Sequence, residues 1–171
     1  MTRIWLLVAG TAACWTGPVA ATDDPARPAT TTAAPKPLAL EVTLERTPCM
    51  GMCPTYKVTI RGDGVVTWNG IANVAASGER TGRVTRKQLG ELDRTLAAIR
   101  FFDLDDQGNL PSPRTFKFSM CTDTSHAIVT AKRGAKQHRV DDPQCGGELV
   151  VEQLELVIDR LANTRRWIGD Q

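Results

Sequence analysis

The sequence has few aromatic residues and few histidines, and its charges nearly balance. Phe, Trp and Tyr together make up 5% of the 171 residues, so we expect a small core built mainly of Leu, Val and Ile. The net charge is only +2, which leaves no strong overall field to draw nucleic acid or an anionic membrane. The chain has 2 histidines, no Gly-rich phosphate loop and no His-rich zinc spacing. The common signatures of phosphoryl-transfer and zinc enzymes are therefore absent.

No apolar stretch is long enough to span a bilayer, which takes about 20 residues, but a shorter one opens the chain. Arg3 supplies a positive charge, residues 4–15 are uncharged and mostly apolar, and Gly17-Pro18 would end a helix. The small residues Val-Ala-Ala then precede a possible cleavage point, as in a signal peptide. We expect residues 1–21 to be removed on export, leaving a periplasmic protein without a transmembrane span.

Cys14 allows a second way in which the N-terminus could be processed. Residues 11–14 (Thr-Ala-Ala-Cys) partly match a lipobox, in which the cysteine is diacylated and becomes the mature N-terminus. Thr11 stands where that motif usually has Leu, so the match is incomplete. The alternative to a free periplasmic protein is thus an envelope protein with a lipid anchor on Cys14.

A low-complexity segment follows this leader. Residues 22–37 consist mainly of Thr, Ala, Pro and Asp, and include no aliphatic or aromatic residue larger than Ala. Such a segment cannot bury enough apolar surface to offset the entropy lost on ordering. We therefore expect a disordered linker over residues 22–37 and a single domain over residues 38–168.

Apolar and polar residues alternate in several segments of this domain, the period of a half-buried strand. A Gly-Asp-Gly sequence at residues 62–64 separates two such segments and predicts a hairpin with positive φ at its centre. Further segments with this alternation lie on both sides of the hairpin. The pattern predicts strands over residues 38–45, 56–61, 65–68, 74–83 (the weakest), 116–120, 127–132 and 136–140.

Two segments have helical spacing instead. Thr85 and Gln88 match a capping box, and leucines follow on one stripe. A second apolar stripe covers residues 148–163. The predicted fold class is α+β: a mainly antiparallel sheet in the order ββ(β)β-α-βββ-α, with two helices packed on one face and stapled by disulfides.

The expected mature domain contains four cysteines: Cys49, Cys53, Cys121 and Cys145. An even number in an exported chain indicates two structural disulfides, and four cysteines allow three pairings. We favour Cys49 with Cys53 and Cys121 with Cys145. The second bond would close the longer loop and add about 3 kcal/mol, whereas the first would mainly stiffen its own loop.

Residues 49–56 form a Cys-x-Gly-x-Cys-Pro-x-Tyr run that leads into the Gly-Asp-Gly hairpin. This opening resembles an uncharacterised bacterial family, domain of unknown function 6438, and the similarity extends over roughly residues 40–168. The resemblance implies an exported domain and assigns no activity. Because the family often has an aromatic residue in place of Met50, the resemblance also indicates that Met50 is a packing residue. Further similar positions are Thr122-Asp123, Leu154-Glu155, Ile158-Asp159 and Trp167-Ile168.

The residues for enzyme chemistry are sparse. Ser125 is adjacent to His126 at the start of a predicted strand, where successive side chains face opposite sides of a sheet. A nucleophile and its base cannot meet in that arrangement, and His138 has no adjacent nucleophile. We lean towards a protein that is not an enzyme, and we expect no catalytic residue, cofactor or metal. An unusual hydrolase with paired carboxylates ranks third among the functions considered.

The leading hypothesis is a non-catalytic cell-envelope domain that binds a protein, a peptide or a cell-wall component through the sheet or the Cys49–Cys53 loop. The alternative is a periplasmic thiol-redox or copper-handling protein that uses the same loop. Met50 and Met52 would add two thioethers to the two cysteine sulfurs, and such soft ligands prefer Cu(I). Redox cysteines usually lie at a helix start with two intervening residues, whereas this pair has three and precedes a predicted strand.

Overall fold

The computed structural model describes residues 36–108, 110, 123–144 and 149–170. All of them belong to one compact unit, Pro35–Gln171, and the other unit is Met1–Ala34. The predicted signal peptide, Cys14, the strand over residues 116–120, Cys121 and Cys145 lie outside the described residues. In the part of the chain that is described, no helix is both long and apolar enough to cross a bilayer.

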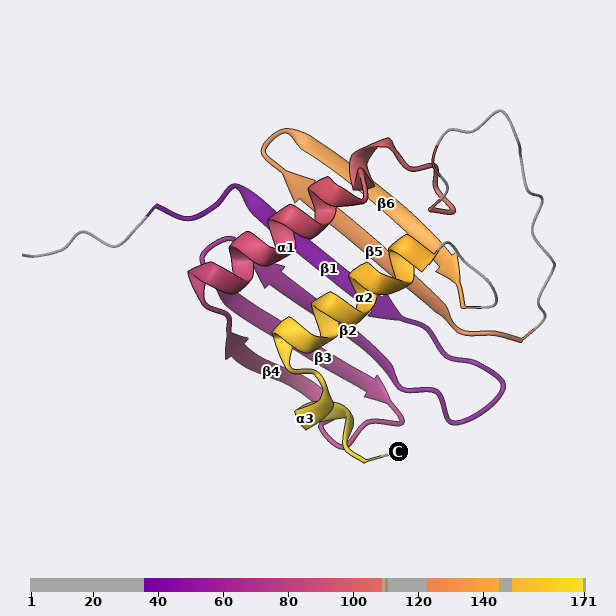
Figure 1. Cartoon of the computed structure of the whole chain (residues 1–171). Coiled ribbons are helices and arrows are strands. Elements are labelled where there is room, and N and C mark those ends of the chain that lie inside the picture. Colours follow the sequence, from indigo (N-terminus) through magenta and orange to yellow (C-terminus); the bar gives the residue numbers. More distant parts are fainter. Residues whose placement is uncertain (1–35, 109, 111–122, 145–148, 171) are drawn as a thin grey trace, which may run out of the picture. The chain divides into compact units, whose positions relative to one another are not determined.

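The described strands form one sheet in which every neighbouring pair is antiparallel, in the order β4-β3-β2-β1-β5-β6 (Figure 1). The alternating pattern predicted four of them at nearly their observed positions. The weak candidate over residues 74–83 is a shorter edge strand, and the strand after the Gly-Asp-Gly hairpin is longer than expected. The strands are β1 (Leu40–Arg46), β2 (Thr55–Arg61), β3 (Val65–Ala72), β4 (Gly78–Arg83), β5 (His126–Arg133) and β6 (Lys136–Pro143).

The hairpin between β2 and β3 differs in detail from the prediction. Only Gly64 has a positive φ there, 83°, and its N–H donates to the carbonyl of Arg61 at 2.8 Å. Asp63 keeps a negative φ, while its carboxylate accepts hydrogen bonds from the Arg61 guanidinium and from the N–H of Val65. The turn is thus the type that ends in one left-handed glycine, held by the aspartate side chain.

Two long helices lie across the same face of the sheet (Figure 1): α1 (Arg86–Ala98) and α2 (Leu149–Ala162). The capping box is confirmed, because the Gln88 N–H donates to the Thr85 hydroxyl and the Thr85 N–H donates to the Gln88 side chain. A 3-10 turn, η1 (Phe101–Asp103), and a short helix, α3 (Arg165–Ile168), complete the described elements. Neither short element was predicted, because each is too short to show a helical period.

The core lies between the helices and the covered face of the sheet. Its residues are mostly Leu, Val and Ile, as the composition indicates, and three of its aromatic side chains form one stack. The ring centroids of Tyr56 and Trp68 are 4.5 Å apart, and those of Trp68 and Trp167 are 5.2 Å apart. The opposite face of the sheet is not covered by these helices (Figure 1). In β1 and β2 that face carries polar side chains. The α+β prediction, with helices on one face, is confirmed.

Candidate functional site

The loop between β1 and β2, residues 47–54, is closed by a disulfide. Cys49 and Cys53 are bonded, with their Cα atoms 5.8 Å apart, so this predicted pairing is confirmed. The bond encloses only Met50, Gly51 and Met52. The enclosed segment is therefore short, and the disulfide joins its two ends.

Both methionines of this loop face solvent. Met50 is 81% exposed and Met52 is 77% exposed, although methionine is usually buried. The expectation that Met50 is a packing residue is wrong: the loop projects beyond the end of the sheet (Figure 1), and most of the Met50 side chain is open to solvent. The loop thus exposes two flexible apolar side chains, and the disulfide restricts the backbone on either side of them.

Hydrogen bonds tie the loop to the strands on both sides. The Thr47 N–H donates to the carbonyl of His126 at 2.9 Å, and the His126 N–H donates to the Thr47 hydroxyl at 2.7 Å. On the other side, the carboxamide of Asn73 donates to the carbonyl of Cys53 at 3.1 Å. These bonds reach β5 and the end of β3, so both ends of the loop are fixed to the sheet.

A network of buried and partly buried polar groups lies beneath the loop, centred on Arg46 at the end of β1. Its guanidinium donates to Glu155 at 3.1 Å and to Asp159 at 3.0 Å, both on α2. It also donates to the Gln144 side chain at 3.3 Å and to the Tyr56 hydroxyl at 3.1 Å. The arginine therefore joins the base of the loop to the helix that covers the sheet.

Tyr56 and Asp159 complete this connection. The Tyr56 hydroxyl donates to Asp159 at 2.7 Å, and the Thr164 hydroxyl donates to the same carboxylate oxygen at 2.9 Å. Burial, followed by the Asp159 charge, raises the pKa of Tyr56, so it remains a neutral donor. Burial opposes the charge of Arg46, but Tyr56, Asp159 and Glu155 outweigh it and raise the pKa of that guanidinium.

Glu155 is the least expected member of the network. Its side chain is 2% exposed, and burial, together with the nearby Asp142 carboxylate, raises its pKa to about 8 against the opposing effect of Arg46. Burial also raises the pKa of Asp142, which is hydrogen-bonded to Glu155. At neutral pH the pair therefore holds one shared proton, and the Gln144 amide donates to both carboxyl groups.

A carboxyl pair that shares a proton resembles the acid–base pair of some hydrolases. Here both groups are buried on the covered side of the sheet. Arg46 and Gln144 donate to Glu155, and Gln144 donates to one oxygen of Asp142, whose other oxygen has no hydrogen-bond partner among the described residues. A substrate would have to displace α2 to reach them. The arrangement supports a structural role: it holds the loop base and helix together.

The histidines form no nucleophile–base pair in the described part of the chain. Nδ1 of His126 lies 2.6 Å from the Asp141 carboxylate on the uncovered face, but no described hydroxyl or thiol hydrogen-bonds to its other ring nitrogen. The His138 ring packs edge-on against Phe101, with ring centroids 5.5 Å apart. Within the described ranges, no group of three or more His, Cys, Asp or Glu side chains could hold a metal ion.

The uncovered sheet face carries two neighbouring hollows of about 290 and 450 Å³. They share Thr59 and Thr67, which belong to a row of threonines in register across five strands: Thr81, Thr67, Thr59, Thr43 and Thr130. The lysines beside this row pair with glutamates of the same face, Lys132 with Glu41 at 3.1 Å and Lys57 with Glu45 at 3.7 Å. The charges of this face are therefore largely satisfied within the domain.

Sequence reasoning found the disulfide loop but missed the network beneath it. A weak signal for the network was present, since Glu155 interrupts the apolar residues of the last helix where they contact the sheet. Its partner Arg46 is 109 positions away, and no local pattern joins the two.

The family model described as Domain of unknown function (DUF6438) matches residues 40–162. The match begins at β1 and ends with α2, so it includes the disulfide loop, the described strands and both long helices. None of the curated proteins matches the chain.

Proposed function

Because the chain belongs to the DUF6438 family, whose description assigns no activity, we propose a function from the domain's own surface: non-catalytic binding of a partner protein in the cell envelope. The disulfide loop would be the recognition element. The observation that carries this proposal is the exposure of Met50 and Met52 on a loop fixed at both ends.

A rigid loop with flexible side chains is well suited to binding. The disulfide and the Arg46 network hold the loop backbone before a partner arrives, so little ordering entropy is lost on association. The unbranched thioether side chains can adapt to an irregular apolar surface. The ordered backbone fixes the position of the loop, and the two methionines provide the apolar contact with the partner.

The shape and chemistry of the loop indicate the kind of partner. The loop projects from the end of the sheet (Figure 1), so its exposed methionines would enter an apolar cleft on the partner. Exposed Ile71 precedes the segment that bonds to Cys53 and adds apolar surface at the same end of the sheet. A protein or peptide offers such clefts more readily than a glycan, whose surface is mainly hydroxyl groups. The sheet face is a weaker candidate because its charges pair with one another.

Location in the envelope is part of the proposal. Disulfides persist mainly in oxidising compartments, and the Cys49–Cys53 bond fits that environment. The N-terminal residues allow either a free periplasmic protein or one anchored by lipid on Cys14. Labelling of cells with a palmitate analogue separates these forms, since only the anchored one takes up label.

The binding proposal is tested with a double variant, Met50→Ser with Met52→Ser. The matched control is Leu156→Ser, which removes another exposed apolar side chain from α2. A partner captured from envelope extract by the wild-type protein is purified, and its affinity is measured for all three proteins. We expect the double variant to bind at least about tenfold more weakly and the control to bind like wild type. Equal binding by the double variant would contradict the proposal.

A second function uses the same loop after reduction. It would bring two thiolates and two exposed thioethers together, a ligand set that favours Cu(I). Against a redox role, the pair leads into β2 and has no helix start to lower a thiol pKa. Titration of reduced protein with Cu(I), together with the reduction potential of the bond, tests this alternative. Binding no tighter than that of free thiols, with a potential below roughly −300 mV, would rule it out.

A further inference from the structure

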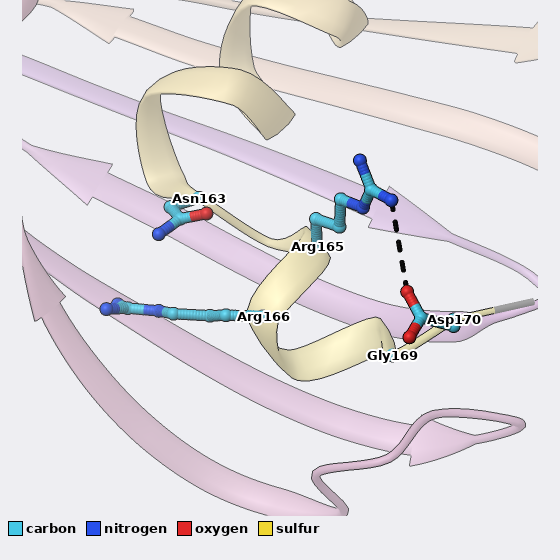
Figure 2. A pocket seen from close by; sticks show the side chains of 5 residues that line it. All are labelled: Asn163, Arg165, Arg166, Gly169 and Asp170. Atoms are coloured by element: carbon cyan, nitrogen blue, oxygen red, sulfur yellow. Dashed lines mark ion pairs between the residues drawn. The ribbon is translucent and has the colours of Figure 1, made fainter.

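The hollow beside α3 gives a ligand no common set of contacts, because the side chains that line it diverge. Figure 2 shows Asn163 and Arg166 extending to one side of this short helix, and Arg165 with Asp170 extending to the other. The uncovered face of the sheet is arranged differently. Its side chains lie in register on neighbouring strands, so they point in the same direction and one ligand can contact several of them.

The row of threonines crosses this face from β4 to β5. The Thr43 and Thr59 hydroxyls lie only 2.9 Å apart, as expected for side chains in register. Neighbouring strands are about 4.8 Å apart, so a row across five strands is roughly 19 Å long. Strand pairing places its members in the order Thr81, Thr67, Thr59, Thr43 and Thr130.

The threonines form the floor of a groove, because longer side chains lie in register on both sides of them. The two hollows of about 290 and 450 Å³ lie along this floor, share Thr59 and Thr67, and together include all members of the row. Their combined volume is within the range of small-molecule sites. The longer side chains are Arg61, Glu41, Lys132 and Gln137 on one side, and Glu79, Asn69, Lys57 and Glu45 on the other.

The cations that line the groove already have acceptors within the domain. A charged ligand would have to compete with these contacts, whereas an uncharged ligand would leave them in place. The lining therefore favours a ligand without charge. The contacts are Lys57 with Glu45 at 3.7 Å, Lys132 with Glu41 at 3.1 Å, Arg61 with Asp63 at 2.8 Å, and Arg80 with the carbonyl of Glu79 at 2.7 Å.

The threonine hydroxyls keep capacity for further hydrogen bonds. A hydroxyl donates one hydrogen bond and accepts two, so the Thr43–Thr59 contact leaves positions open on both groups. Among the described residues, no protein group hydrogen-bonds to the side chain of Thr67, Thr81 or Thr130. Each threonine also carries a methyl group beside its hydroxyl. The floor of the groove thus combines hydroxyl groups that donate and accept with small apolar groups.

We propose that this groove binds an uncharged glycan strand, with the threonine hydroxyls as donors and acceptors. A glycan carries hydroxyl groups along its whole length, and these also donate and accept, while its C–H groups can contact the threonine methyls. A strand of several sugar rings matches a groove that crosses five strands. An extended peptide would instead use the N–H and C=O groups at a sheet edge. The site is separate from the disulfide loop and does not depend on the function proposed for that loop.

The direct test is titration of the ¹⁵N-labelled full chain with cellohexaose, followed by NMR. We expect saturable shifts of the backbone amides of Thr43, Thr59 and Thr67. Glucose should bind at least about tenfold more weakly, because a single ring reaches fewer of the hydroxyls. Raising the salt concentration should leave the affinity for cellohexaose unchanged, because the ligand has no charge to screen. Absence of saturable shifts, or equal affinity for glucose, would overturn the proposal.

The double variant Thr59→Val with Thr67→Val removes two hydroxyls from the centre of the groove. Valine keeps the branched shape and is favoured in strands, so the sheet should be retained. We expect affinity for cellohexaose to fall about tenfold.

Thr95→Val is the matched control, because it removes a hydroxyl from α1, on the covered side of the sheet. It should bind cellohexaose within about twofold of wild type. Thermal unfolding of both variants checks that each is folded. An equal loss of affinity in the double variant and in Thr95→Val would contradict the proposal.

Discussion

Glu155 lies on the face of α2 that packs against the sheet, where an uncharged side chain is favoured. Its pKa of about 8 is above the usual value of 4.5, so the native state holds a proton that the unfolded chain releases between these values. The native state is therefore favoured most strongly by this proton below about pH 4.5. That contribution declines as the pH rises to about 8 and is absent at higher pH.

The first prediction is that Glu155→Gln flattens the dependence of stability on pH. In the wild type, one proton difference corresponds to a slope of up to about 1.4 kcal/mol per pH unit in the free energy of unfolding. Glutamine keeps the shape and can still donate to Asp142, but it does not titrate. Denaturant unfolding at several pH values measures the slope. As a companion variant, Asp142→Asn should move the decline to lower pH, because the Asp142 charge helps to raise the pKa of Glu155.

Arg46 gives a second prediction. Arg46→Met should lower the free energy of unfolding by about 3 kcal/mol, because Glu155 and Asp159 then lose their cation in a largely buried place. Lys132→Met is the matched control on the uncovered face and should cost less than about 0.5 kcal/mol. Chemical denaturation measures both. If both variants lost the same small amount of unfolding free energy, the network would contribute little to holding α2 against the base of the loop.

The loop of residues 47–54 contains both the disulfide, which contributes to stability, and the methionines that we propose bind the partner. Because the Cys49–Cys53 bond closes so few residues, its entropic contribution is small, about 2 kcal/mol. We predict that Cys49→Ser with Cys53→Ser loses about this much stability and retains the sheet. Hydrogen exchange should accelerate in the loop and stay slow in β1 and β2. Fast exchange throughout those strands would show that the bond supports the whole domain instead.

The predictability of the elements follows from how local their signals are. The alternation in β1 and the Thr85–Gln88 capping box lie within a few residues, so the sequence predicts them directly. The short α3 has no period to detect and was missed. The exposure of Met50 depends on where the loop projects from the sheet, which no local pattern encodes. The family resemblance indicated that Met50 packs, and its tertiary position decided otherwise.

At the scale of the whole domain, the architecture explains where binding chemistry is available. One sheet face is covered by α1 and α2, and the charges on the other face pair with one another. Among the described residues, the apolar side chains left exposed to solvent include the two methionines of the disulfide loop. The candidate site could be found only in part from sequence, because its supporting contact joins Arg46 to Glu155 across 109 positions.

The most direct test of the central claim is photo-crosslinking from the loop in intact cells. A diazirine side chain is installed at position 52, and a control protein carries it at position 156, where an exposed leucine lies on α2. Binding through the loop predicts one discrete crosslinked protein from position 52, weakened by Met50→Ser, and no such product from position 156. No product from position 52, or the same products from both positions, would contradict the account.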